Sequence, residues 1–281
     1  MSQEAIVSAA LRALLYEVTV NPKPGLVDPV SNGPHPDMNA FMFIDSAVSL
    51  RAYFEECARL GTAFTGHDLM ALFAQIRPVG VQAEKTMFQA TRNTNTHKGA
   101  IFSLGILVTA AAYQGDGTTN ELMQIVRQML TGLTKNDFVG LPDKPEAELT
   151  AGERQFLKYG IKGIRGEAEA GYPTVMTYAL PELRQSVGTI NQRLLDVLMT
   201  IVRHSVDTNL VKRAKSDHII DWAHDQADRY FEWGGSKTAE GMTFLHELNA
   251  TFTERHLSLG GSADLLILTI FLGIREGILI S

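Results

Sequence analysis

The sequence predicts an all-α protein. Apolar residues recur at intervals of three and four along most of the chain, and almost no segment shows the alternation of a strand. Two segments, residues 99–113 and 265–272, are apolar nearly all round, which is typical of helices buried inside a bundle. We expect one all-helical catalytic domain over residues 1–281, with about ten to twelve helices and a buried central helix or helices.

The individual helices follow from periodicity and from the residues that interrupt it. The first helix should end at Asn21, where two prolines open an irregular stretch that runs to Asp37. Thr-x-x-Glu capping boxes at Thr118 and Thr150 indicate two helix starts, and Arg77-Pro78 should end or kink another helix. Residues 132–149 are predicted to be a surface loop. Further helix faces are formed by Phe43, Ala47, Leu50 and Phe54; by Leu122, Ile125, Met129 and Leu133; and by Val187, Ile190, Leu194, Val197, Leu198 and Ile201.

Composition excludes several classes of protein. The 281 residues carry a formal charge of −6 with no basic cluster, which argues against nucleic acid as the main partner. The single cysteine, Cys57, can form neither an internal disulfide nor a Cys-rich metal site. The N-terminus lacks the basic and apolar regions of a secretion signal, and the most apolar stretch is only about half the ~20 residues of a membrane span. We therefore predict a cytoplasmic protein without a membrane segment.

Polar residues in glycine-rich loops are the candidates for chemistry. Asn95-Thr96-His97-Lys98-Gly99 leads into an apolar helix, whose free amides and dipole would suit an anionic ligand. Lys98 and His97 add donors there, although Asn95 or Thr96 acting as an ordinary N-cap explains the same pattern. The guanidinium of Arg165 suits a phosphate, with Glu167 two residues away, but a turn followed by a solvated helix is equally consistent.

Acidic and amide side chains at helix starts suit a divalent cation. Asp207 and Asn209 follow an apolar helix and Asp264 begins another, and oxygens of this kind hold Mg²⁺. Capping is the commoner explanation for any one of them, and the same holds for Asp28 and Asp37. The pairs His67-Asp68 and His224-Asp225 are also found in helical metal-dependent phosphohydrolases, but their surroundings are typical of helix surfaces.

Taken together, six segments resemble the triphosphoribosyl-dephospho-coenzyme A synthase family over residues 17–272. They are Pro-Lys-Pro-Gly-Leu-Val-Asp from Pro22, His35-x-Asp-Met, Asn-Thr-His-Lys-Gly-x-Ile-Phe-Ser-Leu-Gly from Asn95, Gly-x-Arg-Gly-Glu-Ala-Glu-Ala-Gly-Tyr-Pro from Gly163, Asp-Thr-Asn from Asp207, and Gly-Gly-Ser-Ala-Asp-Leu-Leu from Gly260. Two departures stand out: Ala214-Lys215 replaces a Gly-Gly pair, and Ser258-Leu259 replaces Ser-Pro.

The resemblance implies an all-helical transferase that moves the 5-triphosphoribosyl group of ATP to the ribose 2′-hydroxyl of 3′-dephospho-coenzyme A and releases adenine. The product would serve the acyl carrier of citrate lyase. Alternatives are the counterpart reaction for malonate decarboxylase and, in a different class, a metal-dependent phosphohydrolase. The sequence leaves the oligomeric state open.

The resemblance also implies roles for individual residues. Breaking a glycosidic bond builds positive charge at C1′, which a carboxylate can stabilise, and the attacking hydroxyl needs a base. Asp37, Glu167 and Asp264 compete for these roles, while His97 either lies beside the phosphates or protonates adenine. The residues expected to bind the nucleotide are Lys23, Asn95, Lys98, Arg165 and Arg213, and those expected to hold Mg²⁺ are Asp207, Asn209 and Asp28. We expect these side chains to meet in one crevice.

Overall fold

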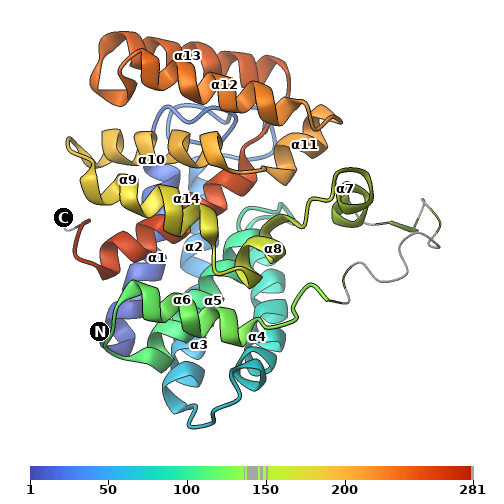
Figure 1. The fold of residues 1–281 in the computed structure, drawn as a ribbon, viewed down its shortest axis with the longest axis vertical. Helices are drawn as coiled ribbons and strands as arrows, with labels where there is room; N and C mark the ends of the chain where they lie inside the picture. The colour runs from blue at the N-terminus through green and yellow to red at the C-terminus, as the bar shows by residue number, and fades with distance from the viewer. Residues whose placement is uncertain (136, 138–144, 146–147, 150, 280–281) are drawn as a thin grey trace.

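The computed structural model describes residues 1–135, 137, 145, 148–149 and 151–279, and none of them lies in a strand (Figure 1). The all-α prediction is therefore confirmed. The α-helices are α1 (Gln3–Thr19), α2 (Ala40–Ser49), α3 (Arg51–Ala63), α4 (Leu69–Ala90), α5 (Lys98–Gln114), α6 (Thr119–Met129), α7 (Ala151–Tyr159), α8 (Gly163–Glu169), α9 (Leu180–Gln185), α10 (Ile190–His204), α11 (Thr208–Ala214), α12 (Ile219–Glu232), α13 (Ala239–Glu254) and α14 (Gly260–Arg275). A π-helix, η3 (Val175–Ala179), and a 3₁₀ helix, η4 (Gly235–Lys237), complete them.

Two helices form the centre of the molecule, as the all-round apolar segments predict. Helix α5 packs against α1, α3, α4, α6 and α14, and α14 packs against α1, α9, α10 and α11 (Figure 1). Nearly every side chain from Ala100 to Ala112 and from Leu265 to Gly273 is buried. Helix α3 approaches α5 so closely that a Cβ on Gly105 would lie 1.9 Å from the Tyr53 hydroxyl. Burial on all sides explains why these two segments carry no polar face.

Helix boundaries agree with the predicted caps where the structure describes them. The Thr118 hydroxyl accepts from the Glu121 amide at 3.3 Å, and Glu121 accepts from the Thr118 amide at 2.7 Å, which confirms that capping box. The box at Thr150 lies outside the described residues, as does most of the predicted loop over 132–149. The irregular stretch after α1 is confirmed.

Two helix boundaries differ from expectation. Arg77-Pro78 was expected to end or kink a helix, and α4 does not end there but continues through Pro78, because apolar side chains on both sides of the proline are buried against the core. The continuous face from Phe43 to Phe54 is divided between α2 and α3 at Leu50. This division and the short helices α8, α9 and α11 raise the helix number above the ten to twelve predicted.

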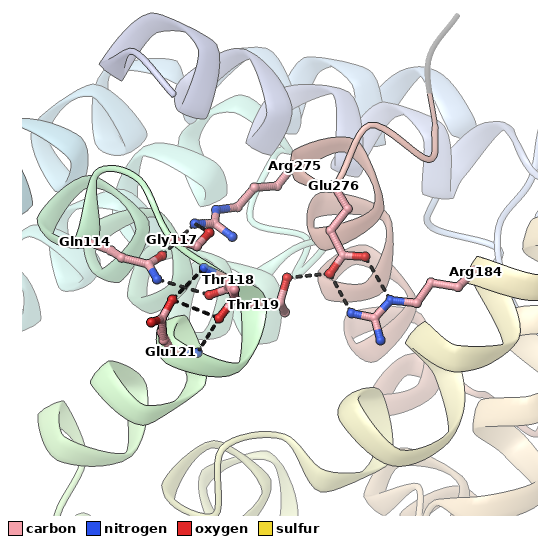
Figure 2. Close-up of polar contacts among 8 residues, drawn as sticks. All are labelled: Gln114, Gly117, Thr118, Thr119, Glu121, Arg184, Arg275 and Glu276. Carbon is pink, nitrogen blue, oxygen red and sulfur yellow. Dashed lines mark hydrogen bonds and ion pairs between the residues drawn. The ribbon is translucent and has the colours of Figure 1, made fainter.

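The C-terminal ends of α5 and α14 are tied together by a polar cluster (Figure 2). Arg275 donates to Gln114 Oε1 at 2.6 Å and to the Gly117 carbonyl at 3.1 Å. Beside it, Arg184 of α9 donates to both carboxylate oxygens of Glu276, at 2.7 and 2.9 Å. These contacts fix the relative positions of the two central helices, whose opposite ends build the site described next.

No helix among the described residues is both long and apolar enough to cross a membrane.

Candidate active site

The N-terminal ends of α5 and α14 meet at a cavity of about 280 Å³, which we call the α5–α14 cavity. The irregular stretch after α1 supplies Leu26, Val27 and Met38 to one wall, and α11 closes another. The polar side chains that line it are Glu17, His35, Asn95, Thr96, His97, Lys98, Asn209, Lys212, Arg213, Ser258 and Asp264. Segments far apart in the sequence therefore converge at the start of the two buried helices.

Asp264 is the fifth residue of α14 and packs directly onto the first turn of α5. A Cβ on Gly99 would lie 1.9 Å from Asp264 Oδ2, so only glycine permits this approach. The Ala100 amide donates to the carboxylate. The Asp264 carboxylate thus accepts a hydrogen bond from an amide at the start of α5, where the sequence predicts an anionic ligand. Burial, followed by the charges of Asp207 and Glu17, raises the pKa of Asp264 well above its usual range, a property typical of catalytic acids and bases.

His97 is a buried, neutral imidazole in the wall of the same cavity. Its Nδ1 lies 2.7 Å from the Ser46 hydroxyl, and its ring meets Phe43 edge-on at 5.1 Å. Its Nε2 is buried and has no hydrogen-bond partner in the structure. Burial, with a smaller contribution from the charge of Lys23, lowers the pKa of His97 to about 3. At neutral pH the ring carries no charge and can donate or accept only as a neutral group.

Helix α11 presents Asn209, Lys212 and Arg213 to the cavity, because positions three and four apart lie on one helix face. His35 accepts from Arg213 at its Nδ1, at 3.3 Å, and donates from Nε2 to the Gly25 carbonyl at 3.3 Å. Burial and the nearby Arg213 charge lower the pKa of His35. His35 therefore acts as a neutral acceptor that orients the guanidinium.

A second cavity of about 630 Å³ adjoins the first between α7, α8 and α11, and we call it the α8–α11 cavity. Asn209 and Lys212 line both cavities, so the two share a wall. The lining carries four basic side chains, Arg77, Lys162, Arg165 and Lys212, against the acidic Asp137 and Glu153. This excess of positive charge suits a polyphosphate.

The predicted basic residues of the two cavities already have partners within the chain. Arg165 donates to both oxygens of Asp137, at 2.6 and 2.9 Å, and to the Leu133 carbonyl at 3.0 Å. Lys98 forms an ion pair with Glu84 at 3.0 Å on the surface, where such a pair adds little stability. A phosphate would therefore displace the Lys98 partner readily and would compete with Asp137 for Arg165.

The structure brings together some of the predicted residues and not others. Asn95, His97, Lys98, Asn209, Arg213 and Asp264 line the α5–α14 cavity, and Arg165 lines the α8–α11 cavity. The other five line neither: Lys23, Asp28, Asp37, Glu167 and Asp207. The predicted single crevice is thus two adjoining cavities.

Four of these five residues, Asp207 among them, are internal partners of other groups. Lys23 is fully buried and pairs with Glu17. Glu167 accepts from the Thr174 hydroxyl at 2.8 Å, and burial raises its pKa. Asp28 accepts from the amides of Val30 and Ser31, both at 2.8 Å, and so stabilises the turn in the irregular stretch. Asp37 is exposed.

The carboxylate oxygens of Asp207, a predicted Mg²⁺ ligand, are occupied by hydrogen-bond donors of the chain itself. Asp207 Oδ1 accepts from the amides of Asn209 and Leu210, at 2.9 and 3.1 Å, and Oδ2 accepts from the amide and hydroxyl of Ser262, at 2.7 and 2.8 Å. These bonds use the roughly four acceptor sites of a carboxylate. Asp207 instead joins the start of α11 to the start of α14. Among the described residues, no three His, Cys, Asp or Glu side chains are grouped to hold a metal.

Four basic or imidazole residues of the site were not among the predicted site residues. Lys212 could have been found, since it lies one helical turn after Asn209. His35 belongs to a segment already singled out. Arg77 and Lys162 have no signal in the sequence, because only the packing of α4 and α8 beside α11 brings them to the α8–α11 cavity.

Comparison with known proteins identifies a family over nearly the whole chain. Residues 3–279 match the model of the CitG family, described as ATP:dephospho-CoA triphosphoribosyl transferase. A probable 2-(5″-triphosphoribosyl)-3′-dephosphocoenzyme-A synthase of Lactiplantibacillus plantarum is 68% identical over 279 residues, which are 99% of this chain and 100% of that protein. A synthase of the same name from Streptococcus equi subsp. zooepidemicus is 39% identical, over 95% of each chain.

A third relative is longer than this chain. Protein CitXG of Leuconostoc mesenteroides subsp. cremoris is 50% identical over 277 residues, which are 97% of this chain and 59% of that protein. No solved structure is significantly similar to the chain.

Proposed function

The chain belongs to the ATP:dephospho-CoA triphosphoribosyl transferase family and is an enzyme of that class, and we propose that its reaction takes place in the α5–α14 cavity. In the reaction, the bond between C1′ of the ATP ribose and the adenine nitrogen breaks. A new bond forms between C1′ and the ribose 2′-oxygen of 3′-dephospho-coenzyme A. The proton lost by the hydroxyl is balanced by the proton that adenine gains.

One observation carries the proposal: a carboxylate with a raised pKa and an unpaired imidazole nitrogen belong to the same small cavity. Asp264 supplies the carboxylate and His97 the imidazole. A raised pKa makes Asp264 a stronger base toward a hydroxyl, and its charge would stabilise the positive C1′. Asp37 is exposed and Glu167 is bonded to Thr174, so Asp264 is the preferred candidate of the three.

The two adjoining cavities suit a reaction between two nucleotides. We assign the triphosphate of ATP to the α8–α11 cavity, because Arg77, Lys162 and Arg165 line it. Asn209 and Lys212, which line both cavities, would lie where the triphosphate joins the ribose. Holding the phosphates there would fix C1′ beside Asp264, and positioning of this kind supplies a large part of the rate.

Magnesium enters this proposal as part of the substrate. Polyphosphates bind Mg²⁺ through their own oxygens, and the ion keeps several waters. The amide oxygen of Asn209 is the predicted metal ligand that remains at the cavity wall. No catalytic step is assigned to the ion.

We further propose that the product serves citrate lyase, in the cytoplasm. The family is named CitG and a relative is named CitXG, which favours citrate lyase over the malonate decarboxylase alternative. The phosphohydrolase alternative rested on two His-Asp pairs. In the structure Asp68 caps α4, and His224 donates to the Ser205 carbonyl at 3.0 Å.

The direct test is chromatography of the protein incubated with ATP, Mg²⁺ and 3′-dephospho-coenzyme A. We expect free adenine and a triphosphoribosylated product, and much less of both with intact coenzyme A, whose 3′-phosphate crowds the 2′-hydroxyl. Asp264→Asn should slow adenine release about 100-fold or more, whereas Glu167→Gln should retain most activity. Release of phosphate without adenine would contradict the transferase reaction, and normal turnover by Asp264→Asn would contradict the site.

A further inference from the structure

A chain of three side chains ends at the unpaired nitrogen of His97. The Thr96 hydroxyl donates to the Ser46 hydroxyl at 2.8 Å, and Ser46 lies 2.7 Å from His97 Nδ1. Ser46 is fully buried in α2, and Thr96 lines the α5–α14 cavity. Neither residue was given a role above. Ser46 contacts the one ring nitrogen that has a partner, and Thr96 acts on that nitrogen through Ser46.

The direction of these hydrogen bonds determines the tautomer of His97. A serine hydroxyl has a single proton to donate. Because Ser46 accepts from Thr96, its own proton is available for Nδ1, and Nδ1 then has to be the unprotonated acceptor. The ring proton of the neutral imidazole consequently lies on Nε2. In the opposite tautomer, Ser46 would accept from Nδ1, and the hydrogen bond between Thr96 and Ser46 would have to reverse its direction.

We infer that Ser46 and Thr96 are positioning residues that hold His97 as a neutral Nε2–H donor for a ring nitrogen of the departing adenine. This inference rests on the proposed function. A buried donor without a partner is costly unless a ligand supplies the acceptor. Burial, with a smaller contribution from the charge of Lys23, lowers the pKa of the ring, so His97 stays uncharged and binds the base rather than attracting a phosphate as a cation. His97 donates a hydrogen bond and transfers no proton in this step. Adenine takes its proton from water, and Asp264 gives the proton of the acceptor hydroxyl to water, so the protons balance.

The tautomer can be measured without reference to activity, by ¹⁵N NMR of the histidine rings in the full-length protein. The signals of His97 are identified by their loss in His97→Gln. We expect the wild type at pH 7 to show a protonated Nε2 and an unprotonated Nδ1. Ser46→Ala should yield a mixture of the two tautomers. Thr96→Val should likewise raise the share of the tautomer that is protonated on Nδ1. A wild-type ring protonated on Nδ1, or an unchanged ring in Ser46→Ala, would overturn the inference.

Ser49→Ala is the matched control. Ser49 lies on the same helix, and its hydroxyl donates only to the Ser46 carbonyl, at 2.7 Å. Ser49→Ala should leave both the His97 tautomer and the turnover unchanged. Ser46→Ala, in contrast, should lower kcat about tenfold with little change in the KM for ATP. A fall in stability without a change of tautomer would indicate a purely structural serine and contradict the inference.

Two probes separate adenine from phosphate as the acceptor. ATP alone should shift the His97 Nε2 signal, whereas inorganic tripolyphosphate at the same concentration should not. An equal shift with tripolyphosphate would overturn the inference by placing phosphate beside His97. Failure of the proposed function is distinguishable, because it would appear as absent adenine release in the wild type whatever the ring tautomer.

Discussion

Replacing Gly99 with alanine tests the contact between the two central helices at the site. The new Cβ would lie 1.9 Å from Asp264 Oδ2 and 2.7 Å from its Cγ. The carboxylate would have to move by about 1.5 Å to reach an ordinary contact distance of about 3.5 Å. A displacement of about 1 Å at a reacting group can cost about 100-fold in rate, so we expect Gly99→Ala to lower kcat by that factor.

The stability of Gly99→Ala should change much less than its activity. Alanine favours a helix over glycine by about 1 kcal/mol, while weakening the hydrogen bond from the Ala100 amide to a charged carboxylate costs about 1.5–3 kcal/mol. The net loss should therefore be about 0.5–2 kcal/mol, which urea unfolding would measure.

The assay is adenine release at saturating ATP and dephospho-coenzyme A, with Gly80→Ala as the matched control. Gly80 lies in α4, and its nearest neighbour to a new Cβ is the Tyr53 hydroxyl at 3.6 Å, an ordinary contact. Gly80→Ala should stabilise the protein slightly and keep wild-type turnover. Wild-type turnover by Gly99→Ala would refute the reasoning, since the Asp264 position would then not matter.

Three further predictions concern stability. The pKa of the Asp264 carboxyl is near 3.8 in the unfolded chain and well above that in the folded protein. The free energy of unfolding of the wild type therefore falls as the pH rises between these two values. In urea unfolding, the stability of Asp264→Asn relative to the wild type should increase above about pH 4. Lys215 has a φ of +57°, in the left-handed region that favours glycine, so Lys215→Gly should raise the free energy of unfolding by about 1 kcal/mol. Glu17→Gln leaves the buried Lys23 ammonium unpaired and should cost about 3–5 kcal/mol, most of which the added Lys23→Met change should restore.

Each of these predictions has an opposite outcome that would contradict it. A constant difference between Asp264→Asn and the wild type across pH would mean that the carboxyl titrates normally in the folded protein. No gain from Lys215→Gly would mean that the left-handed residue is unstrained. A double variant as unstable as Glu17→Gln would mean that Lys23 and Glu17 do not act as a pair.

Sequence periodicity predicted the buried helices but not every break. Helices α5 and α14 were predictable because a helix with apolar residues on all sides has to be buried among other helices. Pro78 was expected to end or kink α4. The helix does not end there, because burial of Leu72, Ile76 and Ala83 outweighs the ~3 kcal/mol cost of a proline in a helix. The break at Leu50 was not predictable, because periodicity reports which face is buried and not whether the axis changes direction.

For the candidate site, the sequence indicated the segments better than the roles. The residue types that cap helices are also those that bind ligands. The sequence therefore does not distinguish Asp207, which caps α11, from Asp264, which lines a cavity. Only packing separates them, since the Asp207 oxygens are occupied by backbone and serine donors. Arg77 was not predicted for a different reason. A basic residue on a helix surface does not indicate in the sequence which cavity it lines.

The central claim is that the ATP ribose is held beside Asp264 with its adenine at His97. The most direct measurement is a crystal structure of Asp264→Asn with ATP, Mg²⁺ and 3′-dephospho-coenzyme A bound. We predict C1′ between residue 264 and the acceptor 2′-hydroxyl, a ring nitrogen of adenine within hydrogen-bond distance of His97 Nε2, and the triphosphate among Arg77, Lys162 and Lys212. Both nucleotides bound elsewhere, with the α5–α14 cavity empty, would contradict it.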